Sequence, residues 1–119
     1  MPDASFRLIV RQGINPGKLD EFKELARQSI EGLEAAEPGT LGYEWFIAED
    51  GRECYLNEFY ADSEAFLAHF AGVGPKIAAM LGISPMIEAV VLGDPSPEAR
   101  EALSKLGVRF YSPHVGFAR

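Results

Sequence analysis

The chain has few residues of the kinds that bind metals or form cross-links. Among its 119 residues there are one cysteine and two histidines. A single cysteine cannot form an internal disulfide, which fits a reducing compartment. No cysteine or histidine residues stand at the short spacings of zinc or haem–thiolate sites. We therefore expect no bound metal and no haem.

Basic clusters and long apolar runs are also missing. The net charge is −7 and the Lys and Arg residues form no cluster, which argues against nucleic acid or an anionic membrane as a partner. No apolar run approaches the roughly 18 residues of a membrane-spanning helix. Residues 1–5 lack the basic and apolar regions of a signal peptide. We expect a cytoplasmic protein.

The size and composition are those of one soluble domain. A chain of 119 residues can bury about two thirds of its unfolded surface, which is enough for one core. Its hydrophobic content of 47% and charged content of 24% are ordinary for a globular protein. We therefore expect residues 1–119 to form a single domain.

A predicted β-hairpin over residues 40–61 is the most informative stretch. Two aromatic and β-branched runs flank Asp50-Gly51, which is typical of a type I′ turn with positive φ at both central residues. This turn sets the register and places Tyr43 opposite Glu58. The side chains that then share one face are Leu41, Tyr43, Trp45, Ile47, Cys54, Leu56, Glu58 and Tyr60.

Glu58 is the only charged residue on that face of the hairpin. A carboxylate among apolar side chains needs a hydrogen-bond donor, a raised pKa or access to water. Glu58 therefore points to a functional site. In the alternative interpretation, Glu58 hydrogen-bonds to Tyr43 and merely ties the sheet to a helix. Cys54 is interpreted as a core residue rather than a nucleophile.

Hydrophobic periodicity predicts the element order β-α-β-β-α-β. The first helix begins after Asn15 as N-cap, with Pro16 at its first position, and runs to residues 38–39. Asp62 caps the second helix, and Pro75 restarts a short helical piece. The predicted strands are residues 6–11, the two arms of the hairpin and residues 83–92. This order predicts an α+β, ferredoxin-like fold: an antiparallel sheet with the helices on one face.

Residues 94–119 extend beyond this order. Ser96 caps a short helix that starts at Pro97 and ends at Gly107. Residues 108–117 are too apolar for a solvated tail. We expect them to dock on their own domain or on a partner subunit.

The other face of the predicted sheet is both aromatic and charged. It carries Arg7, Ile9, Arg11, Glu44, Phe46, Tyr55, Asn57 and Phe59. This mixture predicts a homodimer whose second copy covers the face and pairs Arg7 and Arg11 with glutamates, with Glu44 and Glu88 as candidates. In the alternative, the chain is a monomer and its C-terminal tail covers the same face.

His69, Glu58 and Tyr43 are the candidate catalytic residues. His69 lies on the inward stripe of the second predicted helix, and Glu58 projects from the sheet toward that helix. We predict that the two side chains touch. A carboxylate can fix the tautomer of an imidazole that transfers protons. The predicted substrate-binding residues of this apolar pocket are Trp45, Tyr60 and Phe66. Alternatively, His69 is a satisfied core residue.

Two segments resemble the antibiotic biosynthesis monooxygenase family. They are residues 37–45, Glu-Pro-Gly-Thr-Leu-Gly-Tyr-Glu-Trp, and residues 57–69, which end in Ala-His. The resemblance covers residues 5–93 and implies a dimeric α+β barrel with a pocket in each subunit, leaving 94–119 as an extension. It also implies oxygenation of phenols or quinols with O₂ and without metal or flavin. His69 would be the base or hydrogen-bond partner, assisted by Glu58 and Tyr43, with Trp45 shaping the pocket.

The chain departs from the family pattern at two places. Many members have a second histidine where this chain has Pro75-Lys76. The haem-degrading branch has an Asn on the first strand and a Trp at the place of Tyr60, so haem degradation is disfavoured. The expected function is cofactor-independent oxidation of a small aromatic, phenol or quinol by O₂. The alternatives are a non-catalytic small-molecule binding protein and an isomerase that transfers a proton in the same pocket.

Overall fold

The computed structural model describes residues 4–119, except for the side chains of residues 74 and 75. The strands are β1 (Phe6–Gly13), β2 (Thr40–Ile47), β3 (Glu53–Tyr60), β4 (Met86–Leu92) and β5 (Arg109–Tyr111). The helices are α1 (Leu19–Ile30), α2 (Leu33–Ala36), α3 (Ser63–Gly72), α4 (Gly74–Leu81) and α5 (Pro97–Ser104). Within the described part of the chain, no helix is long and apolar enough to cross a membrane.

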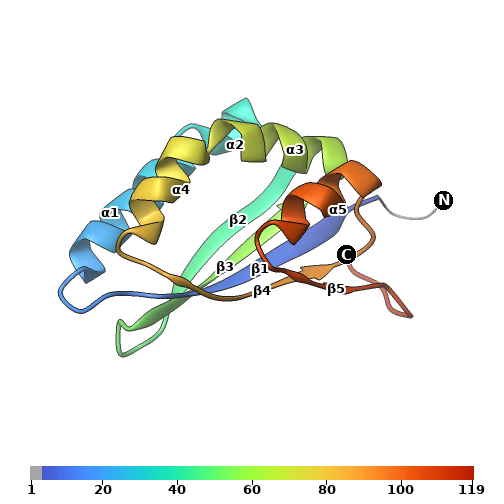
Figure 1. Cartoon of the computed structure of the whole chain (residues 1–119). Helices are drawn as coiled ribbons and strands as arrows, with labels where there is room; N and C mark the ends of the chain where they lie inside the picture. Colours follow the sequence, from blue (N-terminus) through green and yellow to red (C-terminus); the bar gives the residue numbers. More distant parts are fainter. Residues whose placement is uncertain (1–3) are drawn as a thin grey trace.

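The strands form one sheet in the order β2-β3-β1-β4-β5, and the helices lie on one face of it (Figure 1). The first four strands pair antiparallel, which confirms the predicted ferredoxin-like fold. The prediction of a purely antiparallel sheet is wrong at one edge. There β5 pairs parallel to β4, because α5 carries the chain back across the sheet.

The predicted hairpin register is confirmed, but its turn differs. Tyr43 is opposite Glu58, as predicted. Asp50 does not have positive φ; only Gly51 does in this loop, with φ 72°. The Gly51 N–H donates to the Ala48 carbonyl at 2.9 Å, so the loop comprises residues 49–52. The register is kept because this longer loop takes one residue from each arm of the hairpin. Leu41, predicted to face inward, falls at a bulge and is 54% exposed.

The predicted helix bounds need two corrections. Asn15 does not cap α1: its carbonyl accepts from the Lys18 N–H in a turn, and the helix starts at Leu19. The continuous first helix is also interrupted, because Gly32 has φ 77° and separates α1 from α2. By contrast, the predicted caps at Asp62 and Ser96 are confirmed, and each accepts from a backbone N–H three residues on.

The core consists of two clusters between the sheet and the helices. The larger one contains Phe6, Tyr60 and Phe66 with β4 and α5 residues, and the smaller one contains Phe22 and Met80. Trp45 packs against both clusters. Cys54 belongs to the smaller cluster, where burial raises its thiol pKa to about 11, as a core role predicts.

The other face of the sheet is open in the single chain. Phe46 and Tyr55 are about half exposed there. Arg11 pairs with Glu53 at 2.8 Å, and Arg7 lies over the Phe59 ring. Both arginines therefore already have contacts within the chain. Residues 109–111 of the tail dock on β4 and residues 112–119 are exposed, so the tail leaves Phe46 and Tyr55 uncovered.

Candidate active site

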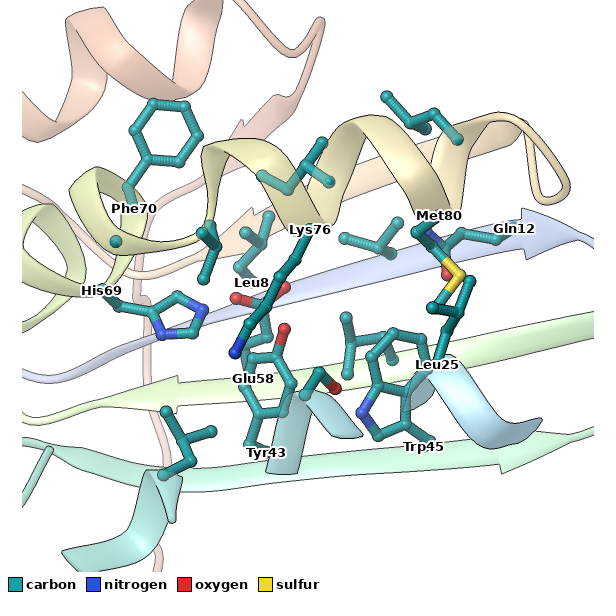
Figure 2. A pocket seen from close by; sticks show the side chains of 18 of the residues that line it. Leu8, Gln12, Leu25, Tyr43, Trp45, Glu58, His69, Phe70, Lys76 and Met80 are labelled. Atoms are coloured by element: carbon teal, nitrogen blue, oxygen red, sulfur yellow. The ribbon is translucent and has the colours of Figure 1, made fainter. Parts of the chain in front are cut away.

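A pocket of about 420 Å³ lies between the sheet and helices α1, α3 and α4. Strands β1, β2 and β3 supply its floor, and the helices supply its walls (Figure 2). Its volume lies in the range of small-molecule sites, and most of its lining is apolar. The polar side chains are few, so each one restricts what the pocket can bind.

His69 and Glu37 form a hydrogen-bonded pair at one end of this pocket. His69 Nδ1 lies 2.8 Å from Glu37 Oε1, and the histidine side chain is only 4% exposed. Thr40 Oγ1 donates to the same Glu37 oxygen at 2.9 Å. A carboxylate on Nδ1 holds the proton on that nitrogen, so Nε2 is left as an acceptor. A histidine held in this way can take a proton from a ligand.

The chain at Gly39 brings Glu37 close to α3. A Cβ atom on Gly39 would lie 2.6 Å from the Ala65 Cβ, so only glycine allows this approach. The Gly39 carbonyl also accepts from the Ala61 N–H at 2.8 Å. These contacts fix the turn after α2 against the start of α3, which holds Glu37 within reach of His69.

Glu58 is buried in the same pocket with Tyr60 as its hydrogen-bond donor. The Tyr60 hydroxyl donates to Glu58 Oε1, so the alternative partner predicted from the sequence, Tyr43, is not the donor. Burial raises the pKa of the Glu58 carboxyl to about 7, and the Tyr60 hydrogen bond only partly offsets that rise. Glu58 can therefore hold a proton near neutral pH, and its Oε2 atom remains for a ligand.

Tyr43 lies near both Glu58 and Glu37. Its ring centroid is 5.1 Å from that of His69, and its neighbour across the hairpin is Glu58. Burial raises the pKa of the Tyr43 hydroxyl, and the nearby charges of Glu58 and Glu37 add to the rise. Tyr43 is therefore a neutral hydrogen-bonding group at neutral pH.

The structure gathers most of the predicted site residues in one pocket. His69, Glu58, Tyr43, Trp45 and Phe66 all line it. Tyr60 is fully buried and is not among the lining residues; it reaches the site through Glu58. Among the described residues Glu58 and His69 form no hydrogen bond with each other: Glu58 accepts from Tyr60, and His69 pairs with Glu37.

Sequence reasoning missed Glu37 and Lys76 as pocket residues. Glu37 is the first residue of the segment 37–45 that resembles the family, and this position was the only indication in the sequence that Glu37 belongs to the site. Lys76 is the only Lys or Arg among the described lining residues, and its side chain extends toward Tyr43 and Glu58 (Figure 2). In the described part of the chain, no three His, Cys, Asp or Glu residues are grouped as a metal ion would require.

The fold and the pocket place the chain among small α+β proteins with a ferredoxin-like domain, here with a histidine–carboxylate pair in an apolar pocket. Within that class, the sequence matches the antibiotic biosynthesis monooxygenase family over residues 5–74. That match covers more than half of the chain, so the chain belongs to this family, as the resemblance implied. A comparison with curated proteins finds no match.

Solved structures share the fold at low sequence identity. MupZ from Pseudomonas fluorescens has a TM-score of 0.83 at 20% identity, covering 97% of this chain and 94% of its own. SnoaB, a cofactor-independent oxygenase from Streptomyces nogalater, has a TM-score of 0.65 at 18% identity, covering 78% of this chain and 95% of its own. Rv0793 from Mycobacterium tuberculosis has a TM-score of 0.66 at 22% identity, covering 77% of this chain and 96% of its own. MupZ thus also matches the fold of the C-terminal extension.

Proposed function

We propose that this protein is a cofactor-independent monooxygenase that oxidises a small aromatic phenol or quinol with O₂. The observation that carries the proposal is the pair of the buried His69 and the half-buried Glu37, which lines an apolar pocket. Family membership supports a monooxygenase role. SnoaB, which has a similar fold, is a cofactor-independent oxygenase. The substrate class is part of the proposal.

In this proposal His69 Nε2 removes the proton from a substrate hydroxyl. The resulting anion gives one electron to O₂, and the two radicals join as a peroxide on a ring carbon. His69 returns its proton to the outer oxygen of the peroxide. The ring carbon then loses its hydrogen as a proton while the O–O bond breaks, and Glu58 gives its proton to the leaving hydroxide, which forms water. The proton from the carbon restores the acid form of Glu58. One oxygen atom stays on the substrate as a carbonyl. The substrate supplies all the electrons, so no external reductant is required.

The apolar lining supports this sequence of steps. Excluding water strengthens the electrostatic interaction between the substrate anion and nearby cations, and it protects a peroxide from side reactions. Lys76 extends toward the same end of the pocket and provides such a cation. Glu58, with a pKa of about 7, can return a proton near neutral pH.

Oxygen uptake with product analysis tests the proposal. A panel of hydroquinones and dihydroxynaphthalenes is compared for wild type, His69→Ala and His114→Ala, after subtraction of spontaneous autoxidation. His114 is a matched control because it lies in the exposed tail. We expect His69→Ala to reduce uptake at least about tenfold, which corresponds to about 1.4 kcal/mol of barrier. Equal uptake by wild type and His69→Ala would reject His69 as the base.

Proton transfer without oxygen is a second candidate, favoured by the presence of an acid and a base in one pocket. Glu58 holds a proton up to about pH 7, while His69 has a free Nε2. Deuterium incorporation into a ketone or phenol under anaerobic conditions would identify this activity. A non-catalytic binding protein would show neither uptake nor exchange, although it would bind the same ligands.

We also propose that two copies associate through the open face of the sheet. Phe46 and Tyr55 on β2 and β3 and Ile87 on β4 are each about half exposed. Such a face is typical of a subunit interface. Light scattering at micromolar concentration should give a dimer mass. Tyr55→Glu should give a monomer, whereas Ile30→Glu, at an exposed apolar position of α1 over the opposite face of the sheet, should not.

A further inference from the structure

Gln12 is a polar residue at an apolar position of the sheet. The inward side chains of β1 are Phe6, Leu8, Val10 and Gln12, and all four are buried. Gln12 is 6% exposed, and its Oε1 atom has no hydrogen-bond partner among the described residues. A buried amide oxygen without a partner is destabilising, so an apolar residue would suit folding better at this position.

Trp45 presents a second unpaired polar atom to the same pocket. Its ring is held edge to face against Phe22 and Tyr43, with centroids 5.7 Å and 5.9 Å away. Its Nε1 atom is buried and has no acceptor among the described residues. An indole N–H is a donor only, and an amide Oε1 is an acceptor only. Gln12 and Trp45 therefore offer complementary hydrogen bonds.

Both residues lie at the end of the pocket away from His69. Figure 2 shows Gln12 and Trp45 with Leu25 and Met80 at this end, and Tyr43, Glu58, His69 and Lys76 at the other. All of these residues line the same cavity. The pocket thus has polar groups at both ends. Its floor is largely apolar: Leu8 lies beside Glu58, and Val10 and Leu56 lie level with Trp45.

We infer that Gln12 and Trp45 form a second polar subsite, which binds an oxygen of the substrate at the end opposite the one His69 acts on. Here "far subsite" means the Gln12 amide and the Trp45 indole N–H. The inference rests on the proposed function for the role of His69, and it narrows the substrate class. The substrate is a flat apolar molecule with an oxygen function at each end. A hydroxyl can donate to Gln12 Oε1 or accept from Trp45 Nε1–H, whereas a carbonyl can only accept, from Trp45 Nε1–H or from the NH2 group of Gln12.

Binding of two matched probes tests the far subsite. The probes are 2,6-dihydroxynaphthalene and 6-methyl-2-naphthol, which differ only in a hydroxyl or a methyl group at one end. Dissociation constants are measured by calorimetry in anaerobic buffer, so no turnover is needed. We expect wild type to bind the dihydroxy compound about fivefold more tightly, the effect of one neutral hydrogen bond.

The variants Gln12→Leu and Trp45→Phe should each bring the two affinities closer together. The control Asn57→Leu makes a similar amide-to-leucine change on the other face of the sheet and should leave the preference unchanged. Equal affinities in wild type, an unchanged preference in both pocket variants, or Kd values above about 1 mM for both probes would overturn the inference.

The tryptophan also gives a direct signal, because Trp45 is the only one in the chain. Its indole Nε1–H gives a single side-chain resonance. We expect that resonance to move downfield with 2,6-dihydroxynaphthalene and much less with 6-methyl-2-naphthol. Equal shifts with both probes would show that no hydrogen bond forms at Nε1, which contradicts the far subsite.

Thermal unfolding separates a binding role of Gln12 from a structural one. Without ligand, Gln12→Leu should raise the Tm, because it removes an unpaired buried oxygen. A lower Tm would show that Gln12 supports the fold and would count against the inference. Oxygen uptake is measured separately from probe binding, so the two proposals can fail independently. A preference for the dihydroxy probe without oxygen uptake would retain the far subsite and reject the oxygenase. Oxygen uptake without that preference would retain the oxygenase and reject the far subsite.

Discussion

His69 Nδ1 and Glu37 Oε1 lie 2.8 Å apart, although the two residues are 32 positions apart in the sequence. The contact joins the turn before β2 to the inner face of α3. Glu37 is half-buried and is also held by Thr40, whereas His69 is almost fully buried. The pair therefore sets the tautomer of the proposed base before any ligand binds.

Replacing Glu37 by Gln should lower activity while leaving the fold intact. The amide keeps the size of the side chain but does not hold the Nδ1–H tautomer as a carboxylate does. We expect kcat for oxygen uptake to fall about ten- to a hundredfold, the usual range of general-base effects. Glu34→Gln on the exposed side of α2 is the control and should keep full activity. An unchanged pH profile and kcat in Glu37→Gln would contradict the proposed role of the pair.

The sequence predicted the parts of this site that depend on strand and helix periodicity. Glu58 and Tyr43 follow from the hairpin register, and His69 follows from the inward stripe of α3. The position of Glu37 depends on a turn, whose path is set by the close approach of Gly39 to Ala65 rather than by any period. The parallel strand β5 was missed because its three residues are too few to show alternation.

The Gly39→Ala change tests the close approach directly. The added Cβ would lie 2.6 Å from the Ala65 Cβ, so the turn and α3 must separate. We expect a loss of about 1–3 kcal/mol in the free energy of unfolding, as for other overpacked sites. Gly72→Ala in α3 is the control, because a Cβ there meets nothing within 4 Å. Urea unfolding measures both, and equal stabilities would argue against the contact.

The stability of the protein should depend on Glu58 between about pH 4.5 and pH 7. Its pKa is raised from 4.5 to about 7 in the folded state. Below that window the carboxyl is neutral in both states. As the pH rises through it, the unfolded carboxyl ionises first, so the folded state loses relative stability, up to about 3 kcal/mol.

Glu58→Gln removes this titration while leaving an acceptor for the Tyr60 hydroxyl. We therefore expect the variant to be more stable than wild type near pH 8 and to lose the advantage near pH 4, in urea unfolding at each pH. Glu24→Gln provides the contrast. Hydrogen bonds from Arg27 lower the Glu24 pKa to about 2, so its contribution should not change between pH 5 and pH 8. A wild-type advantage over Glu58→Gln that grows with pH would contradict the raised pKa.

Lys76 should favour ligands that bind as anions. It is exposed at the pocket, and its side chain extends toward Tyr43 and Glu58, where the proposed substrate anion forms. Lys76→Met keeps the length of the side chain and removes the charge. Because exposed charges are screened, we expect a loss of only about two- to fivefold in affinity for a phenolate, and none for the neutral phenol. Calorimetry with 4-nitrophenol on both sides of its own pKa separates the two forms. Lys105→Met, just after α5, is the control. Equal losses for the neutral and ionised forms would show that Lys76 acts through packing rather than through its charge.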